Sequence, residues 1–293
     1  MGNRKKSSGR AASQGRDGSI ADALRVRGKS VSLSKWDADS TPGIRDREEA
    51  AERLARNLER MDELQYGLYA EGRRSLLLVF QGMDAAGKDG VIRKVATAFN
   101  PQGCRAWSFK APTPEELAHD FLWRIHRAAP AKGEVAIFNR SHYEDVLIVR
   151  VHDLVPKRVW SERYAIINEF ERRLAEHGTT ILKFFLHISP EEQLERIRKR
   201  LDDPEKHWKF NEADLDERTR WDDYQRAFED ALARCNTEHA PWFVIPANRK
   251  WYRDVAVSEI VTATLEGMDP RPNAVSLDVK RLKSRLARAG AAR

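Results

Sequence analysis

The stretch from Leu76 to Gly90 constrains the fold of this 293-residue chain more than any other. Leu76–Phe80 is an unbroken apolar run, which predicts a short strand buried on both faces. Gly82, Gly87 and Lys88 then fit the pattern G-x-x-x-x-G-K, in which main-chain amides surround an anion and the lysine reaches the outer phosphates. Apolar residues at helical spacing follow. This order predicts a phosphate-binding loop, or P-loop, against the alternative that a Gly-Lys turn occurs by chance.

The loop departs from the usual pattern at its eighth position. Asp89 stands where a P-loop commonly has Ser or Thr, whose hydroxyl binds Mg²⁺. Other groups must then hold a metal ion, and the carboxylate of Asp84 inside the loop is the first candidate. The residues expected to bind phosphate are Gly82, Ala85, Ala86, Gly87, Lys88, Asp89 and Gly90.

Four more segments predict strands, namely Arg105–Phe109, Val135–Phe138, Ile181–Ile188 and Trp242–Ile245. Amphipathic helical patterns separate them, among them a helix that Thr113 caps and that buries Leu117, Phe121 and Ile125. Strands that alternate with helices predict a three-layer α/β/α protein with a five-stranded parallel sheet, whose ligands bind at the carboxyl ends of the strands. The tryptophans expected in the core are Trp107, Trp123 and Trp160.

A second polar cluster, Asn139–Asp145, follows the third predicted strand directly. Asn139 occupies the place where a P-loop protein commonly has a carboxylate for Mg²⁺. Mg²⁺ usually takes one or two carboxylates together with phosphate oxygens, so Asp84 and Glu144 would suffice as its protein ligands. Arg140 is expected to face the transferred phosphoryl group. The alternative is an ordinary polar loop with Tyr143 packed inward.

A run of cations follows the fourth predicted strand, where phosphoryl-transfer enzymes often carry a mobile lid. Its candidate polyphosphate or lid residues are Arg196, Lys199, Arg200, Lys206 and Lys209. The alternative is a solvated helix face, which is what most charge runs are.

The net charge of +7 is carried by the two ends of the chain. Residues 1–30 have a net charge of +6 and residues 275–293 of +5, which leaves −4 for the residues between them. The first 30 residues are expected to form a disordered basic tail, with a nucleic-acid-binding arm as the less favoured alternative. Residues 271–293 are expected to form a basic tail or a short helix, whose apolar stripe of Val279, Leu282 and Leu286 docks on the body or on a partner.

Composition also bounds the location of the protein. No apolar run approaches the roughly 20 residues that cross a bilayer, and the N-terminus lacks the apolar segment of a secretory signal. Cys104 and Cys235 form no disulfide or metal-binding pattern, which is typical of a reducing compartment. A cytoplasmic location without membrane contact is therefore expected.

Four ordered motifs resemble the family-2 polyphosphate kinases. They are Gly82–Gly90, Ser108–Lys110 with Pro114–Glu116, Phe138–Asp145 and Asp203–Phe210. The resemblance covers about residues 31–270. It implies a fold like thymidylate kinase with a helical lid at about residues 196–214. It also implies an enzyme that moves the terminal phosphoryl group of inorganic polyphosphate to a nucleotide with Mg²⁺, Mn²⁺ being a second candidate.

The resemblance also implies roles for individual residues. Asp84, Lys88, Arg140 and Glu144 become the expected catalytic residues, and Lys110, Asn139 and Arg140 are expected to contact the acceptor nucleotide. Many members have Asp where this chain has Asn139, and the version with Asn resembles the subgroup credited with phosphorylating both AMP and ADP. The expected ligands are therefore polyphosphate, AMP, ADP and ATP, or their guanine counterparts. A homo-oligomer is also expected.

Two other functions remain open from the sequence. A nucleoside or nucleotide kinase with ATP as donor would use the same loop. A non-catalytic nucleotide-binding module would explain Asp89 and Asn139 as lost chemistry, with the basic tails gripping nucleic acid.

Overall fold

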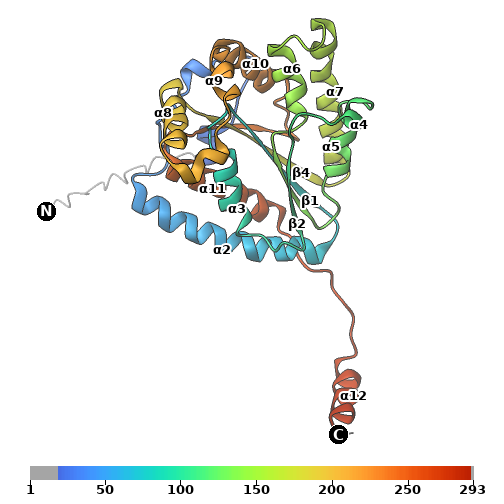
Figure 1. Cartoon of the computed structure of the whole chain (residues 1–293). Coiled ribbons are helices and arrows are strands. Elements are labelled where there is room, and N and C mark those ends of the chain that lie inside the picture. Colours follow the sequence, from blue (N-terminus) through green and yellow to red (C-terminus); the bar gives the residue numbers. More distant parts are fainter. Residues whose placement is uncertain (1–18, 292–293) are drawn as a thin grey trace, which may run out of the picture.

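The computed structural model describes residues 19–291 and is built around a five-stranded parallel sheet (Figure 1). The strand order is β2-β3-β1-β4-β5, and every neighbouring pair is parallel. The strands are β1 Ser75–Gln81, β2 Cys104–Ser108, β3 Val135–Asn139, β4 Thr179–His187 and β5 Trp242–Pro246. All five predicted strands are confirmed, with ends that differ by at most two residues.

Helices cover both faces of the sheet and complete the predicted three layers. In Figure 1, α2, α3 and α11 lie on one side of the sheet and α5 and α7 on the other. The α-helices are α1 Ile20–Leu24, α2 Arg47–Glu71, α3 Lys88–Ala96, α4 Pro114–Leu117, α5 Trp123–Ala128, α6 Ile148–Val151, α7 Lys157–Glu176, α8 Pro190–Leu201, α9 Ala213–Arg218, α10 Trp221–Arg234, α11 Lys250–Met268 and α12 Val279–Ala291. The 3-10 helices are η1 Leu33–Lys35, η2 His142–Val146 and η3 Pro204–Lys209. No described helix combines the length and the apolar character needed to cross a bilayer.

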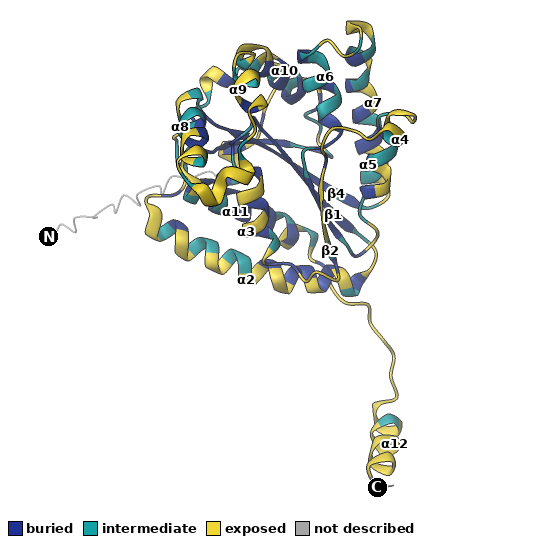
Figure 2. Ribbon diagram, in the orientation of Figure 1, coloured by how far each residue is buried: buried dark blue, intermediate teal, exposed yellow. Residues whose placement is uncertain are grey.

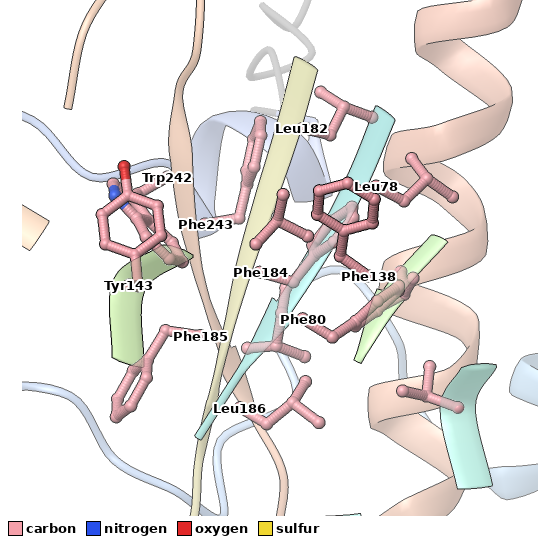
Figure 3. Packing of buried hydrophobic residues seen from close by; sticks show 14 of the residues in the cluster. Leu78, Phe80, Phe138, Tyr143, Leu182, Phe184, Phe185, Leu186, Trp242 and Phe243 are labelled. Atoms are coloured by element: carbon pink, nitrogen blue, oxygen red, sulfur yellow. The ribbon is translucent and has the colours of Figure 1, made fainter. Parts of the chain in front are cut away.

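The central strands are apolar because both of their faces are covered. Every residue of β1 is buried, and Phe80 stacks on Phe184 of β4 with ring centroids 5.0 Å apart (Figure 3). β1 therefore lies in the middle of the sheet and delivers the P-loop to the centre of its carboxyl edge.

The segment after β2 differs from its prediction. Thr113 forms the expected capping box with Glu116, but the helix ends at Leu117 and a second helix, α5, begins at Trp123. Leu117 is 69% exposed rather than buried, while Ile125 is buried as expected. The wrong assignment arose because apolar residues in two short helices and in the turn between them happened to keep a helical spacing.

The three tryptophans expected in the core have different surroundings. Trp160 is buried and Trp123 is half-buried, but Trp107 is 39% exposed. Trp107 belongs to β2, which is the edge strand of the sheet and is exposed over most of its length (Figure 2). The core assignment of Trp107 is therefore wrong, because an edge strand has only one neighbour.

The expected N-terminal tail of residues 1–30 is too long. Residues 1–18 lie outside the described part of the chain, but Ile20, Leu24 and Val26 are buried. The amide of Val26 donates to the carbonyl of Trp242 at 2.9 Å, so this segment lies against the edge of β5. The described N-terminal segment belongs to the folded body.

The C-terminal segment forms the expected short helix, α12, which stands apart from the body (Figure 1). Val279 and Leu286 are 53% and 73% exposed. The expected docking of its apolar stripe on the body is therefore wrong for the single chain, and docking on a partner stays a prediction.

Candidate active site

The P-loop connects β1 to α3 and has the backbone conformation that glycine permits. Gly82 has φ +153° and Gly87 has φ +100°. A Cβ atom at Gly87 would lie 2.0 Å from Nη1 of Arg253, and one at Gly82 would lie 2.9 Å from the carbonyl oxygen of Leu186. Both glycines have a backbone conformation that other residues rarely adopt, and at Gly82 an added Cβ would also collide with a main-chain oxygen. The loop ends at the N-terminus of α3, where free amide groups attract anions.

Lys88 is almost fully buried and folds back over this loop. Its Nζ donates to the carbonyl oxygens of Gly82 at 2.6 Å and Met83 at 3.1 Å, and lies 4.0 Å from Oδ1 of Asp84. Burial lowers the pKa of Lys88, as does the charge of Arg140, whereas Asp84 raises it. A bound phosphate would add the negative partner that favours the charged amine.

Arg140 joins the P-loop to the end of β3. Its Nη2 donates to Oδ1 of Asp84 at 2.6 Å, and its Nη1 lies 3.6 Å from Oε2 of Glu144. Burial raises the pKa of Asp84, but the charges of Lys88 and Arg140 outweigh burial, so the pKa of this carboxyl is lowered. The four residues expected to be catalytic are therefore brought together by two loops at the carboxyl edge of the sheet.

Asp84 and Glu144 fit the demands of a divalent cation. Their carboxylates approach the same guanidinium from two loops, and Mg²⁺ takes one or two carboxylates together with phosphate oxygens and water. Within residues 19–291, no group of three or more His, Cys, Asp or Glu residues could hold a metal ion unaided. Substrate phosphate oxygens would therefore have to complete the coordination.

A groove of about 980 Å³ runs over the P-loop, and twelve Lys and Arg residues line it together with Phe109 and Trp208. Asn139 lies on its wall and donates to Oδ1 of Asp89 at 2.6 Å. The groove brings together these predicted residues: Asp84, Ala85, Gly87, Lys88, Asp89, Gly90, Lys110, Asn139, Arg140, Arg196, Lys199, Arg200, Lys206 and Lys209. Gly82 and Glu144 line a second cavity instead, and Ala86 is fully buried in the loop.

Sequence reasoning missed several cations of this groove. They are Arg93 and Lys94 on α3, and Lys250 and Arg253 on α11. Arg253 is 3% exposed, and its Nη1 lies against the P-loop at Gly87. The start of α11 follows the carboxyl end of β5, so position after a parallel strand was a usable signal for Lys250 and Arg253.

Arg196 has a different role from the one expected of a lid cation. It is 7% exposed, and each of its five N–H groups has an acceptor. The acceptors are a carboxylate oxygen of Glu192 and the carbonyl oxygens of Ala85, Ala86, Ala247 and Asn248. Arg196 therefore ties α8 to the back of the P-loop, with no N–H group left for a ligand.

A second cavity of about 190 Å³ adjoins the groove and shares Asp84, Arg140 and Asp214 with it. One part of its wall is apolar, with Leu147, Ile148 and Phe228 among the lining residues. The remaining lining residues are Gly82, Met83, Glu144, Asn211, Ala213, Glu217 and Tyr224. The two cavities thus meet at the carboxylate–guanidinium pair of Asp84 and Arg140.

The site combines a glycine loop at the end of the central strand, a buried lysine beside that loop and an arginine that faces both. These groups suit the transfer of a negatively charged phosphoryl group. The fold and the site thus define a P-loop phosphotransferase. The model of the polyphosphate kinase 2 family matches residues 44–273, and this chain belongs to that family. The expected family, fold and class of enzyme are confirmed.

Relatives of known name agree with this assignment. An AMP/ADP-polyphosphate phosphotransferase of Meiothermus ruber is 54% identical over 83% of this chain and 93% of its own length. An ADP-polyphosphate phosphotransferase of Rhodopseudomonas palustris is 46% identical over 82% and 88%. The crystal structure of polyphosphate kinase 2 from Arthrobacter aurescens superposes with a TM-score of 0.89 at 45% identity and covers 93% of this chain and 98% of its own.

Proposed function

We propose that this protein transfers the terminal phosphoryl group of inorganic polyphosphate to AMP and to ADP, forming ADP and ATP, with Mg²⁺ or Mn²⁺. The observation that carries this proposal is the junction of two unlike cavities at Asp84 and Arg140. The groove offers cations from α3, α8, η3 and α11, more than one triphosphate requires. The family and the names of the relatives support the same donor and acceptors.

The two cavities suggest how the substrates are divided. Polyphosphate has no apolar part and suits the long cationic groove, whereas a nucleoside has an apolar base and suits the wall of Leu147, Ile148 and Phe228. The acceptor phosphate then lies near Arg140, which lines both cavities. Lys110 and Asn139 line only the groove, so we assign them to phosphate rather than to the base.

The mechanism follows from charge and position. Lys88, Arg140 and the main-chain amides of the P-loop neutralise the donor chain, so that an anionic acceptor can approach it. An oxygen of the acceptor phosphate attacks the terminal phosphorus in line, and the shortened polyphosphate departs. The protein contributes alignment and electrostatic stabilisation rather than a covalent intermediate. Asp84 and Glu144 would hold a divalent metal ion, and such an ion would neutralise charge on the phosphate oxygens.

An assay without ATP tests the proposal. Purified protein, Mg²⁺, polyphosphate and AMP should yield ADP and then ATP, and ADP alone should yield ATP. The Lys88→Ala variant should lose at least about a hundredfold in kcat, because it removes a preorganised positive charge at the reacting phosphate. A parent protein that works only with ATP as donor would instead be an ordinary nucleotide kinase. A parent protein that works with neither donor would be a binding module.

A further inference from the structure

A pair of opposite charges lies fully buried beneath the η2 turn. Lys183 on β4 and Glu171 on α7 have no exposed side-chain area, and Nζ of Lys183 donates to Oε2 of Glu171 at 2.6 Å. Nζ also donates to the Tyr143 hydroxyl at 2.8 Å and to the carbonyl oxygen of Cys235 at 2.6 Å. Such burial excludes contact with substrate, so the pair takes no direct part in phosphoryl transfer.

The pair is bonded to the turn that follows β3. The Tyr143 hydroxyl donates to Oε1 of Glu171 at 2.9 Å, and Nε2 of His142 lies 3.2 Å from the same oxygen. His142 and Tyr143 are also fully buried, and the Tyr143 ring packs edge-on against Trp242 of β5, beside which it lies in Figure 3. β4, α7 and β5 therefore hold these two residues from three sides.

His142 and Tyr143 lie between Arg140 and Glu144, the two residues of this segment that face the site. Ser141 is fixed as well, since its Oγ accepts a hydrogen bond from Nε2 of Gln81 at 3.1 Å. Arg140 precedes it with φ +60°, a conformation that is uncommon for a residue other than glycine and that persists where the surroundings fix it. Arg140 and Glu144 thus extend to Asp84 and the second cavity from the two ends of an anchored segment.

A buried ion pair is weak evidence for a contribution to stability. Removing two charges from water is expensive, and apolar residues of similar volume are often equally stable or more stable in such places. Hydrogen bonds differ from apolar contacts in being directional, so they fix the orientation of the groups that they join. Lys183 and Glu171 direct such bonds at Tyr143 and His142.

We propose that Lys183, Glu171 and Tyr143 form a positioning network that holds Arg140 and Glu144 in the geometry needed for phosphoryl transfer. None of the three touches substrate. The inference rests on the proposed function, because the positions that matter are those of the groups around the reacting phosphate. A shift of about 1 Å in such groups can cost a hundredfold in rate.

The conservative variant Tyr143→Phe tests the network first. It keeps the ring and removes the hydroxyl that joins Lys183 and Glu171 to the turn. With polyphosphate and AMP, kcat should fall at least about tenfold while KM for polyphosphate changes less than about twofold, because the loss acts on the transition state. Tyr164→Phe is the matched control. Tyr164 is buried, lines neither cavity, and its hydroxyl accepts a hydrogen bond of 3.2 Å from Arg150. It should keep the parent kcat.

Two double variants separate positioning from packing. Lys183→Met with Glu171→Gln removes both charges but keeps an oxygen that accepts from Tyr143, and it should keep at least a third of the parent kcat. Lys183→Met with Glu171→Leu removes that acceptor as well. Its kcat should fall at least about tenfold in assays run well below its melting temperature, where both double variants are folded.

The results decide between this inference and the function on which it rests. A parent protein without polyphosphate-dependent activity overturns the proposed function. An active parent whose Tyr143→Phe variant keeps its kcat overturns the network, as do two folded double variants with equal kcat. Should neither double variant fold, Tyr143→Phe with its control decides alone.

Discussion

Arg196 and Lys199 lie one helical turn apart on α8 and have opposite surroundings. Arg196 is buried with all of its N–H groups bonded, whereas the side chain of Lys199 is 64% exposed on the wall of the groove. The sequence presents both as members of one basic run. What separates them is the set of acceptors nearby. Main-chain carbonyl oxygens satisfy Arg196, whereas Lys199 pairs with the exposed carboxylate of Glu195 at 3.0 Å and stays accessible to an anionic ligand.

Substitution at these two residues should therefore have different consequences. Arg196→Lys keeps the charge but loses most of the five hydrogen bonds, so the free energy of unfolding should fall by at least about 2 kcal/mol. Lys199→Ala should leave the free energy of unfolding unchanged and raise KM for polyphosphate about two- to fivefold. Urea unfolding and steady-state kinetics of both variants measure these effects. A Lys199→Ala variant with unchanged KM would remove Lys199 from the binding groove.

β4 ends in a contact that attaches the N-terminal segment to the body. Nε2 of His187 lies 2.9 Å from the carbonyl oxygen of Trp36, so this ring nitrogen carries the proton and donates. Burial lowers the pKa of His187, while the bond to Trp36 and the charge of Asp37 raise it less. The ring is therefore neutral in the folded protein at a pH where it is already protonated in the unfolded chain.

The sign of the resulting pH dependence follows from proton binding. The unfolded chain takes up a proton near pH 6.5, and the folded protein does so only at lower pH, so stability is lost as the pH falls below about 6.5. His187→Gln keeps a donor for the Trp36 carbonyl but cannot titrate. Between pH 7.5 and 5.5, the free energy of unfolding should fall more in the parent than in the variant, by up to about 1.4 kcal/mol per pH unit. Urea unfolding measures this difference. An equal loss of free energy of unfolding with pH in parent and variant would exclude His187 as the titrating group.

At the scale of the whole molecule, the fold concentrates cations that the sequence disperses. Residues 31–274 carry a net charge of −4, yet α3, α8, η3 and α11 all contribute Lys or Arg to one groove. Parallel strands bring the ends of these elements to the same edge of the sheet. A chain whose body is acidic overall can therefore bind a polyanion at one place.

Salt should weaken donor binding more than acceptor binding. Raising NaCl from 50 to 300 mM at constant Mg²⁺ should increase KM for polyphosphate several-fold and KM for AMP much less, because added ions screen and compete with many contacts along the groove. In the Lys94→Ala variant, KM for polyphosphate should rise less steeply with NaCl, since Lys94 lines the groove. Equal salt dependence for both substrates would contradict the division of the cavities.

Removal of α12 tests whether the C-terminal helix belongs to the catalytic unit. A chain that ends at residue 274 keeps Asn273, whose Nδ2 donates to the carbonyl oxygen of Glu71 at 2.8 Å, and loses residues 275–293, which include α12. Its kcat, KM for short polyphosphate and melting temperature should equal those of the parent. Loss of activity would instead show that α12 acts on the site or on a partner copy.

The sequence by itself determined those features whose cause is local. Short runs rich in apolar residues predicted β1, β3, β4 and β5, the pattern of Arg105–Phe109 predicted β2, and Gly82, Gly87 and Lys88 predicted the loop. The residues that form each of these features are neighbours in the chain. Order along the chain was enough to place Asn139–Asp145 on the same carboxyl edge as that loop, and the pairing of β3 with β1 in the folded sheet makes them neighbours.

Only the tertiary structure decided how the polar residues are used. Arg196 finds its acceptors in Ala86 and Ala247, 110 and 51 residues away, and Lys183 in a strand of apolar pattern finds Glu171 and Tyr143. Arg253 likewise meets the P-loop from the far end of the sequence. Spacing along a chain predicts burial, but the role of a buried charge depends on partners that only the folded chain brings within hydrogen-bonding distance.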